Sequence, residues 1–430
     1  MDLKRLETAR LFHRFGFGPR PGEFTQALSD GVVKTKSKFL SQPLIDAGEV
    51  PAPVITDLGP RPAPNSAGVV AFSQSLRFEN QQMLLWWLDQ MVKSERQLQE
   101  KMVWFWHGHW ATSIGKVNYS LPMYNQNKTF RKYALGNFSD FAQAMFSDGA
   151  LQIWLDGGDN NVKAPNENLS REMMELFILG VNRYTESDVK ELARAFTGYQ
   201  IGRSSGMVTY NEKRRDTKAV TILGKTGVLT PEQAIAHLVS QADCGKFIAE
   251  RVWYRFISAQ EKLPEAHPMI SAFEQRDISK LIATLISGTE LSNPTYTSVK
   301  PPVEWFVSVC RALSLTPSTL DSYTKLYGYL SKLSQIPFEP PNVGGWPSDE
   351  SWLSSASAQF RVAFATWLVG QADLSSLIAI APTKRATYLL DLLGVVEWTP
   401  RTMFALRDVR ESEVKLLTLA ICSPEYVVSV

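Results

Sequence analysis

Apolar residues recur along much of the chain at the spacing of amphipathic α-helices. The clearest run has a period of about 3.6 residues and consists of Leu84, Leu85, Leu88, Met91 and Val92. It predicts a long helix over residues 73–107, with a break near Ser94, which caps a second segment. Similar stripes predict helices over residues 138–146 and 169–177, the second of which is ended by Gly180.

Glycine and proline mark where the helical pattern stops. The first helical region is interrupted by Phe15-Gly-Phe-Gly-Pro-Arg-Pro21. Prolines then recur between residues 43 and 68, which predicts an extended connection on the surface. Two short runs rich in strand-forming residues, 206–210 and 219–223, predict a small β-hairpin between helices.

Helical patterns continue through the C-terminal third, at about 269–288, 302–315, 320–334, 353–370, 384–393 and 411–422. The chain lacks the alternating βα units of a doubly wound sheet or barrel. We therefore predict a mainly α fold: one large multi-helix globular domain of residues 1–430, with a small β-hairpin inserted near residues 200–228. Its candidate subdivisions are residues 1–262, which hold the polar cluster and the hairpin, and residues 263–430.

The composition excludes several classes of protein. Of the 430 residues, 44% are hydrophobic and 20% are charged, which is enough for a substantial core. The net charge of +2 gives no electrostatic basis for binding nucleic acid or an anionic membrane. No apolar stretch approaches the roughly 18 residues of a membrane span. The N-terminus also lacks the apolar region of a secretory signal, so the sequence predicts a soluble protein that is cytoplasmic by default.

Two histidines, His107 and His109, stand among tryptophans in Trp104-Phe-Trp-His-Gly-His-Trp110. Residues two apart on a helix point to different sides, so both rings face one ligand only if the helix ends near Gly108. There they would supply two nitrogens to a divalent metal, zinc, iron or manganese, with carboxylates from elsewhere. The alternative is a pair of rings packed among aromatic residues and hydrogen-bonded to the backbone or to a carboxylate.

The segment Asn166–Phe177 supplies the candidate carboxylates. Asn168, Glu172 and Glu175 fall at positions i, i+4 and i+7 of a helix, and Arg171 lies four residues before Glu175. In a cleft, Glu172 or Glu175 would be a metal ligand or a base of raised pKa, with Arg171 orienting it. A solvated helix face with an ion pair would have the same pattern.

Further polar residues are candidates for supporting roles. Arg194 lies within the next predicted helix, and Asp216 and Lys218 follow in the predicted hairpin. His13 ends the first helix, before the Gly-Phe-Gly turn. Asp216 is a candidate catalytic residue, and His13, Asn168, Arg194 and Lys218 are candidate binding residues. For each of them alone, a structural role is the alternative.

Eight segments, in this order, carry a resemblance to a known family: Leu11-Phe-His-Arg-Phe-Gly-Phe-Gly18, Phe105-Trp-His-Gly-His109, Asn166-Glu-Asn-Leu-Ser-Arg-Glu-Met-Met-Glu-Leu-Phe-Ile-Leu-Gly180, Tyr184-Thr-Glu-Ser-Asp-Val189, Ala193-Arg-Ala-Phe-Thr-Gly198, Lys300-Pro301, Pro340-Pro-Asn-Val-Gly-Gly-Trp346 and Ser423-Pro-Glu-Tyr426. The chain resembles, over nearly its whole length, the bacterial domain-of-unknown-function 1800 family. The central segment is the most specific of the eight.

The resemblance implies little about chemistry, because the family carries no agreed activity. Its members commonly carry export signals, which implies a periplasmic or exported location. They are often encoded beside a second uncharacterised family that resembles sulfatases and phosphatases, which implies a candidate protein partner. This chain departs from the pattern in lacking the export signal and in having Arg215-Asp216 where the family often has His-Asp. If that histidine binds a ligand or carries a proton, activity in this chain is altered.

Two functions remain open. The leading hypothesis is an enzyme with an interior site in which His107, His109, Glu172 and Glu175 surround a divalent metal that activates water or binds substrate oxygens. The alternative is a non-catalytic binding or assembly protein. Its polar cluster would be a buried structural network, and the segment that contains Trp346 would form a binding surface. Convergence of the four side chains in an open pocket would favour the enzyme.

Overall fold

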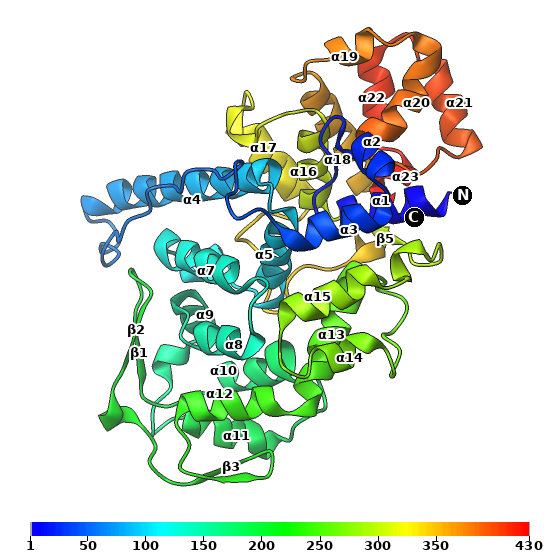
Figure 1. Ribbon diagram of the computed structural model, residues 1–430. Coiled ribbons are helices and arrows are strands. Elements are labelled where there is room, and N and C mark those ends of the chain that lie inside the picture. Colours follow the sequence, from blue (N-terminus) through cyan, green and yellow to red (C-terminus); the bar gives the residue numbers. More distant parts are fainter. Residues whose placement is uncertain (1, 430) are drawn as a thin grey trace.

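Helices make up most of the computed structural model, which describes residues 2–429 (Figure 1). Helical residues account for 59% of the chain, and the strands are few and short. The mainly α fold predicted from the sequence is confirmed. Within the described residues, no helix combines the length and the apolar character needed to cross a membrane.

The elements follow the hydrophobic pattern of the sequence. Those of the first half are α1 Leu3–Arg14, α2 Glu23–Asp30, α3 Val32–Ser41, α4 Gly68–Lys93, α5 Gln97–His109, α6 Ile114–Val117, α7 Ser120–Tyr133, α8 Phe138–Phe146, α9 Gly149–Trp154, η1 Gly157–Asp159, α10 Glu167–Glu172, the π-helix η2 Met173–Ile178 and α11 Glu186–Ala195. Those of the second half are η3 Glu212–Arg214, α12 Pro231–Ser240, α13 Ala242–Phe256, α14 Pro268–Ala272, α15 Ile278–Ser287, η4 Glu290–Ser292, α16 Pro302–Ala312, η5 Pro317–Thr319, α17 Tyr323–Lys332, η6 Asp349–Trp352, α18 Ser355–Val369, α19 Ser375–Ile378, α20 Pro382–Leu393, α21 Pro400–Asp408, α22 Glu413–Ile421 and α23 Pro424–Val427.

The strands pair locally, with one exception. They are β1 Tyr199–Gly202, β2 Met207–Tyr210, β3 Val220–Ile222, β4 Lys225–Gly227, β5 Ser298–Val299 and β6 Val428–Ser429. The sequence predicted one hairpin, but the structure has two, β1–β2 and β3–β4. Each predicted run pairs with its own neighbour, because Gly206 and Gly224 adopt positive φ (69° and 80°) and provide two separate tight turns. The exception is β5–β6, which ties the end of the chain to its middle.

The long helix predicted over residues 73–107 is two helices, α4 and α5, and the predicted break at Ser94 is confirmed. Ser94 has an extended backbone (φ −53°, ψ 138°), and its hydroxyl accepts a hydrogen bond from the Arg96 amide at 3.0 Å. The N-cap of α5 is Arg96 itself, which has no side-chain cap. Ser94 therefore stabilises the turn without occupying the predicted N-cap position.

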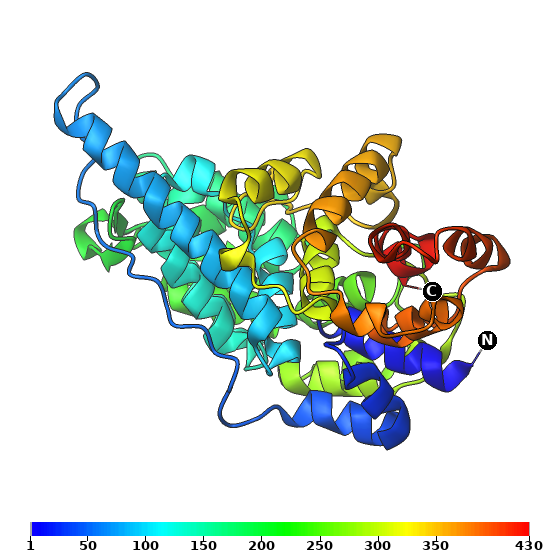
Figure 2. The same ribbon diagram turned by 90° about the horizontal axis from the view of Figure 1, so that it is seen from above.

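The proline-rich connection between α3 and α4 runs extended beside α4 (Figure 2). Side chains of α4 satisfy its backbone: the Val50 amide donates to Gln90 Oε1 at 2.8 Å, and the Thr56 amide donates to Glu79 Oε1 at 3.0 Å. Because these bonds replace secondary structure, the segment lies on the surface without forming a helix or a strand. The prediction of an extended surface connection is confirmed.

Buried apolar residues from all parts of the chain form one connected cluster. Its largest fully buried side chains are five tryptophans, Trp87, Trp106, Trp110, Trp253 and Trp305. Near the end of the described chain, β6 lies beside α1, so that both ends of the fold come together (Figure 1). The continuity of the cluster supports our proposal that residues 1–430 form one domain, without a boundary between residues 1–262 and 263–430.

Candidate functional site

The two histidines of the His-Gly-His segment contact different partners. His107 Nε2 accepts a hydrogen bond from the Phe338 amide at 3.0 Å, whereas His109 Nε2 lies 2.9 Å from the Phe177 carbonyl oxygen. Helix α5 continues through His109, so the rings keep the divergent directions that their spacing imposes. The two imidazoles therefore do not converge on one centre.

The predicted metal site is not supported. Within residues 2–429, no group of three or more His, Cys, Asp or Glu side chains is arranged to hold a metal ion. Helix α5 directs His107 and His109 apart. Glu172 and Glu175 lie on other elements, α10 and η2. The four residues predicted as ligands of zinc, iron or manganese therefore do not form a metal-binding group in the described part of the chain.

His107 holds a strained turn in place. Burial lowers the pKa of His107 to about 3, so the ring is neutral and its Nε2 lone pair is free to accept the Phe338 amide. Phe338 has a φ of 68°, which is unfavourable for a residue with a side chain. Its carbonyl oxygen accepts the Ile114 amide at 2.9 Å. Hydrogen bonds on both sides thus fix the start of the segment that leads to Trp346.

The other end of that segment lies directly against α5. Gly345 has a φ of 82°, and a Cβ atom there would lie 2.3 Å from the Gly108 carbonyl oxygen. Only glycine allows this approach. The approach brings Trp346 onto Trp104, with ring centroids 5.1 Å apart and planes at 27°. The sequence Gly-Gly-Trp therefore serves to stack an indole on the helix that carries His109.

Beside this stack lies a small pocket of about 60 Å³, which we call the aromatic–basic pocket. Its walls come from α5, α13 and two loops, and they consist of Trp104, Phe105, Gly108, His109, Arg251, Tyr254, Arg255, Pro301, Gln335, Trp346, Pro347 and Ser348. Of the residues predicted from the sequence, the pocket brings together His109 and Trp346. Three of the segments that carry the family resemblance also meet here.

His109 is held in one tautomer. Burial, with a smaller contribution from the nearby Arg251, lowers its pKa to about 3, so the ring is neutral. Its Nε2 therefore donates to the Phe177 carbonyl oxygen, which lies near the C-terminal end of η2, where carbonyl groups lack helical partners. His109 Nδ1 then carries a lone pair, and it is buried without a hydrogen-bond partner among the described residues.

Two arginines on α13 make the pocket basic. Arg255 pairs with Glu304, whose other oxygen lies 2.5 Å from Lys101 Nζ. Arg251 forms no hydrogen bond or ion pair in the described part of the chain, and its guanidinium lies 5.7 Å from the centroid of the Tyr254 ring. Burial lowers the pKa of both arginines. Lys101 and Arg255 therefore share the Glu304 carboxylate, whereas Arg251 has no counter-charge among the described residues.

No motif in the sequence pointed to Arg251 and Arg255. Their spacing of four residues places both on one face of an apolar helix, and this was the available signal. Arginines at that spacing are usually solvated, so the pattern alone does not indicate a pocket. Only the packing of α13 against α5 shows that they face His109.

Two of the predicted catalytic carboxylates, Glu175 and Asp216, have partners elsewhere in the fold. The Tyr184 hydroxyl donates to Glu175, and Arg171 forms two hydrogen bonds of 2.7 Å with Glu186. Burial, together with the charge of Glu175, raises the pKa of Glu172, which is half-buried. The ion pair of Arg171 fits the alternative interpretation, in which this segment is a solvated helix face.

Residues predicted around the hairpin hold it against α11. Arg194 bonds Glu191 and Asp216, each at 2.8 Å, and Asp216 Oδ1 accepts the Lys218 amide at 2.9 Å. Arg215, the departure from the family pattern, donates to the Leu229 carbonyl oxygen at 3.4 Å. These contacts connect elements of the fold and do not reach His109.

His13 and Asn168 also contact the backbone. His13 Nε2 lies 3.0 Å from the Leu393 carbonyl oxygen, and burial and two neighbouring lysines lower the pKa of His13. Asn168 Nδ2 donates to the Leu155 carbonyl oxygen at 3.3 Å. These contacts join separate helices. The binding roles of His13 and Asn168 remain predictions.

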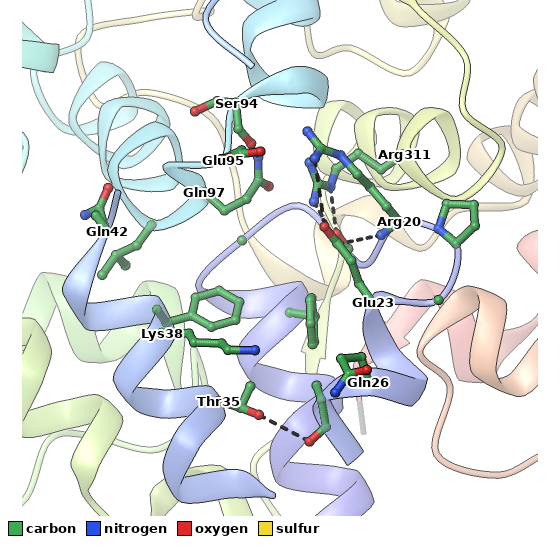
Figure 3. A pocket seen from close by; sticks show the side chains of 18 residues that line it. Arg20, Glu23, Gln26, Thr35, Lys38, Gln42, Ser94, Glu95, Gln97 and Arg311 are labelled. Carbon is green, nitrogen blue, oxygen red and sulfur yellow. Dashed lines mark hydrogen bonds and ion pairs between the residues drawn. The ribbon is translucent and has the colours of Figure 1, made fainter. Parts of the chain in front are cut away.

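A larger cavity, of about 530 Å³, lies between α1, α2, α3 and the start of α5 (Figure 3). Arg311 and Arg20 converge on Glu23 at its upper edge, with nitrogen–oxygen distances of 3.2 and 3.9 Å. Lys38 pairs with Asp30 at 2.5 Å. Each of the three cations that line this cavity pairs with a carboxylate, and none of the predicted site residues lines it.

Comparison with known proteins identifies one relationship. A family model described as "Protein of unknown function (DUF1800)" matches residues 10–428. No curated protein and no solved structure matches the chain. The match covers all walls of the aromatic–basic pocket.

Proposed function

This chain belongs to the DUF1800 family of proteins of unknown function, and we propose that it is an enzyme whose substrate carries an oxyanion and binds in the aromatic–basic pocket. The observation that carries the proposal is the pairing of an uncompensated guanidinium, Arg251, with a neutral imidazole, His109, in one pocket.

Arg251 supports recognition of an anion. Removing a charge from water without a partner is costly, so buried cations in proteins are normally paired. A carboxylate, phosphate or sulfate group bound to Arg251 would remove this penalty through a bidentate contact. The pocket volume of about 60 Å³ is twice the roughly 30 Å³ that one water occupies in the liquid. A single oxyanion head group matches that volume, whereas the rest of the substrate would extend past Tyr254 toward solvent.

His109 supports catalysis by proton transfer. Its Nδ1 lone pair is free, and the hydrogen bond to the Phe177 carbonyl would stabilise the ring once Nδ1 takes up a proton. The positive charge of Arg251 contributes to the low pKa of His109. An anion on Arg251 would cancel this charge and raise the pKa of His109, so substrate binding would make the imidazole a better base. Trp104 and Trp346 would exclude water from the reacting groups.

The non-catalytic alternative is favoured by a specific observation. Glu175 and Asp216, together with Arg171 and Arg194, are engaged in ion pairs or hydrogen bonds within the fold. A protein that binds the same oxyanion without transforming it would use Arg251 and the two tryptophans in the same way. His109 would then only accept a hydrogen bond.

Isothermal titration with inorganic phosphate, sulfate and acetate tests anion binding. We expect saturable binding that weakens about tenfold or more in Arg251→Gln, since an ionic hydrogen-bonded pair contributes a few kcal/mol. Gly108→Leu provides a second variant, because a Cβ at Gly108 meets no atom within 4 Å and a larger side chain would fill the pocket without displacing the backbone. Binding that is the same in wild type and both variants would contradict the proposal.

The stability of two matched variants gives an independent readout. Arg251→Gln removes an uncompensated cation and is expected to raise the free energy of unfolding by roughly 1 kcal/mol. Arg255→Gln, one helical turn away, leaves the buried Glu304 with only Lys101 and is expected to lower it by about 2–4 kcal/mol. Urea unfolding measures both. A loss of stability in Arg251→Gln would show that this side chain has a structural partner.

Turnover separates the enzyme from the binding protein. Aryl phosphate and aryl sulfate monoesters, which carry an oxyanion, are suitable substrates for a first panel, with His109→Gln as the control. Hydrolysis that is lost in His109→Gln would support the enzyme. Anion binding that depends on Arg251, with no turnover that depends on His109, would support the non-catalytic alternative.

A further inference from the structure

A second pocket lies at the opposite end of the segment that carries Trp346. It has a volume of about 600 Å³ and lies between α4, α17 and the turn at residues 337–339. Its walls include Phe78, Tyr323 and Tyr327. We call it the tyrosine pocket. Its size is that of a small-molecule site, for which roughly 300–1,000 Å³ is typical.

The tyrosine pocket contains an uncompensated carboxylate. Both oxygens of Glu339 lie close to the Tyr327 hydroxyl, at 3.0 and 3.1 Å. In the part of the chain that the structure describes, no lysine, arginine or histidine forms an ion pair with Glu339. Arg77 lines the same pocket but is exposed and lies outside ion-pair distance. Burial raises the pKa of Glu339, as expected for a carboxylate that has lost water without gaining a cation.

Aromatic faces surround this carboxylate. The rings of Tyr323 and Tyr327 lie 6.0 Å apart, at an angle of 40°. Phe78 is an unusually exposed aromatic residue, with 62% of its surface accessible. Burial and the Glu339 carboxylate raise the pKa of both tyrosines to about 12, so the rings are neutral and electron-rich. Aromatic faces around a carboxylate are the chemistry that proteins use to bind ammonium groups.

The arrangement is fixed before any ligand binds. Phe338, which precedes Glu339, is held at a φ of 68° by its hydrogen bonds to His107 and Ile114. A strained residue held from both sides positions the next side chain without further ordering. Binding would therefore require little loss of conformational entropy in the protein.

We propose that the tyrosine pocket binds the ammonium group of a small organic molecule. The Glu339 carboxylate neutralises the charge, and the rings of Tyr323, Tyr327 and Phe78 contact the methyl or methylene groups around the nitrogen. The proposal does not depend on the function proposed for the aromatic–basic pocket, from which it differs in the sign of the charge that it recognises.

Isothermal titration with choline and with cadaverine tests the proposal. The matched probe for choline is 3,3-dimethylbutan-1-ol, which has the same shape without the charge. We expect saturable binding of at least one cation. The neutral analogue should bind at least about tenfold more weakly than choline. If neither cation gives saturable heat at millimolar concentration, or if choline and its neutral analogue bind equally, the proposal is wrong.

Variants then assign the binding to this pocket. Glu339→Gln keeps an oxygen acceptor for the Tyr327 hydroxyl but removes the charge, and it should weaken cation binding about tenfold. Tyr323→Leu should weaken it about threefold or more, since a cation–π contact contributes about 0.5–2 kcal/mol. Arg251→Gln should leave it unchanged. Near-UV circular dichroism confirms that each variant is folded, and equal affinity in wild type and Glu339→Gln would overturn the assignment.

Discussion

At the scale of single residues, the contact between Gly345 and Gly108 decides whether the aromatic–basic pocket exists. The φ of 82° and the missing Cβ at Gly345 allow the loop to approach α5 and bring Trp346 onto Trp104. The sequence identified this segment through its Gly-Gly-Trp motif. It could not show which backbone atom the glycine approaches, since that atom is 237 residues away along the chain.

Substituting this glycine tests its role. We expect Gly345→Ala to lower the free energy of unfolding by about 1–3 kcal/mol, because the backbone conformation becomes strained and the new Cβ displaces the loop from Gly108. Urea unfolding measures the loss, and quenching of tryptophan fluorescence reports the stacking of Trp346.

The neighbouring Gly344 provides the control. It has no positive φ, and a Cβ there would meet only the Asn342 side-chain oxygen, at 3.2 Å. Gly344→Ala should therefore change stability much less. Equal effects of the two substitutions would contradict the role assigned to the close approach at Gly345.

At the scale of elements, local signals predicted where helices begin and end. Thr185 and Asp188 form a capping box at the start of α11, and Pro231 opens α12 at a first-turn position. The same signals did not predict the π-helix η2, which interrupts the helix that carries Glu172 and Glu175. A π-helix usually occurs as a single turn within an α-helix, so the local signals that mark where a helix begins and ends do not reveal it.

Helix α9 allows a prediction about pH. Its N-cap, Asp148, accepts hydrogen bonds of 2.8 Å from the Leu151 amide and from Gln126. Burial raises the pKa of Asp148 to about 7, above the value of about 3.9 in an unfolded chain. The resulting stabilisation is fully present below pH 4 and is lost as the pH rises to 7, at about 1.4 kcal/mol per pH unit.

Asp148→Asn keeps a neutral cap and removes this titration. We expect the stability of the wild-type protein, relative to this variant, to fall between pH 5 and pH 7.5. Urea unfolding at the two pH values measures the difference. Parallel pH profiles of the two proteins would show that Asp148 titrates at its ordinary pKa.

At the scale of the whole molecule, the three buried histidines have the opposite effect. Burial lowers the pKa of His13, His107 and His109 below the unfolded value of about 6.5. The unfolded chain therefore takes up protons that the folded chain does not, and stability falls as the pH drops below 6.5. Each histidine contributes a slope of about 1.4 kcal/mol per pH unit.

The pH dependence of the free energy of unfolding can be assigned to individual histidines by substitution. His107→Gln, which keeps an acceptor for the Phe338 amide, should reduce their combined slope between pH 6.5 and pH 5 by about a third. Urea unfolding at several pH values measures it. An unchanged slope would show that His107 is protonated in the folded protein.

The sequence by itself determined the mainly α fold, most helix positions and the family. Helical periodicity, capping boxes, glycine stops and proline-rich connections depend on residues within a few positions of one another, so they can be read locally. It also identified two members of the pocket, His109 and Trp346, because aromatic residues, histidine and glycine rarely cluster without a reason in packing.

Only the tertiary structure decided which side chains meet. It separated His107 from His109, paired Glu175 with Tyr184, and brought Arg251 into the same pocket as His109 from a helix far along the chain. A charge without a partner has no sequence signature, because what distinguishes it is the absence of a neighbour after folding. The same holds for Glu339, whose lack of a cation depends on how α4 and α17 pack around it.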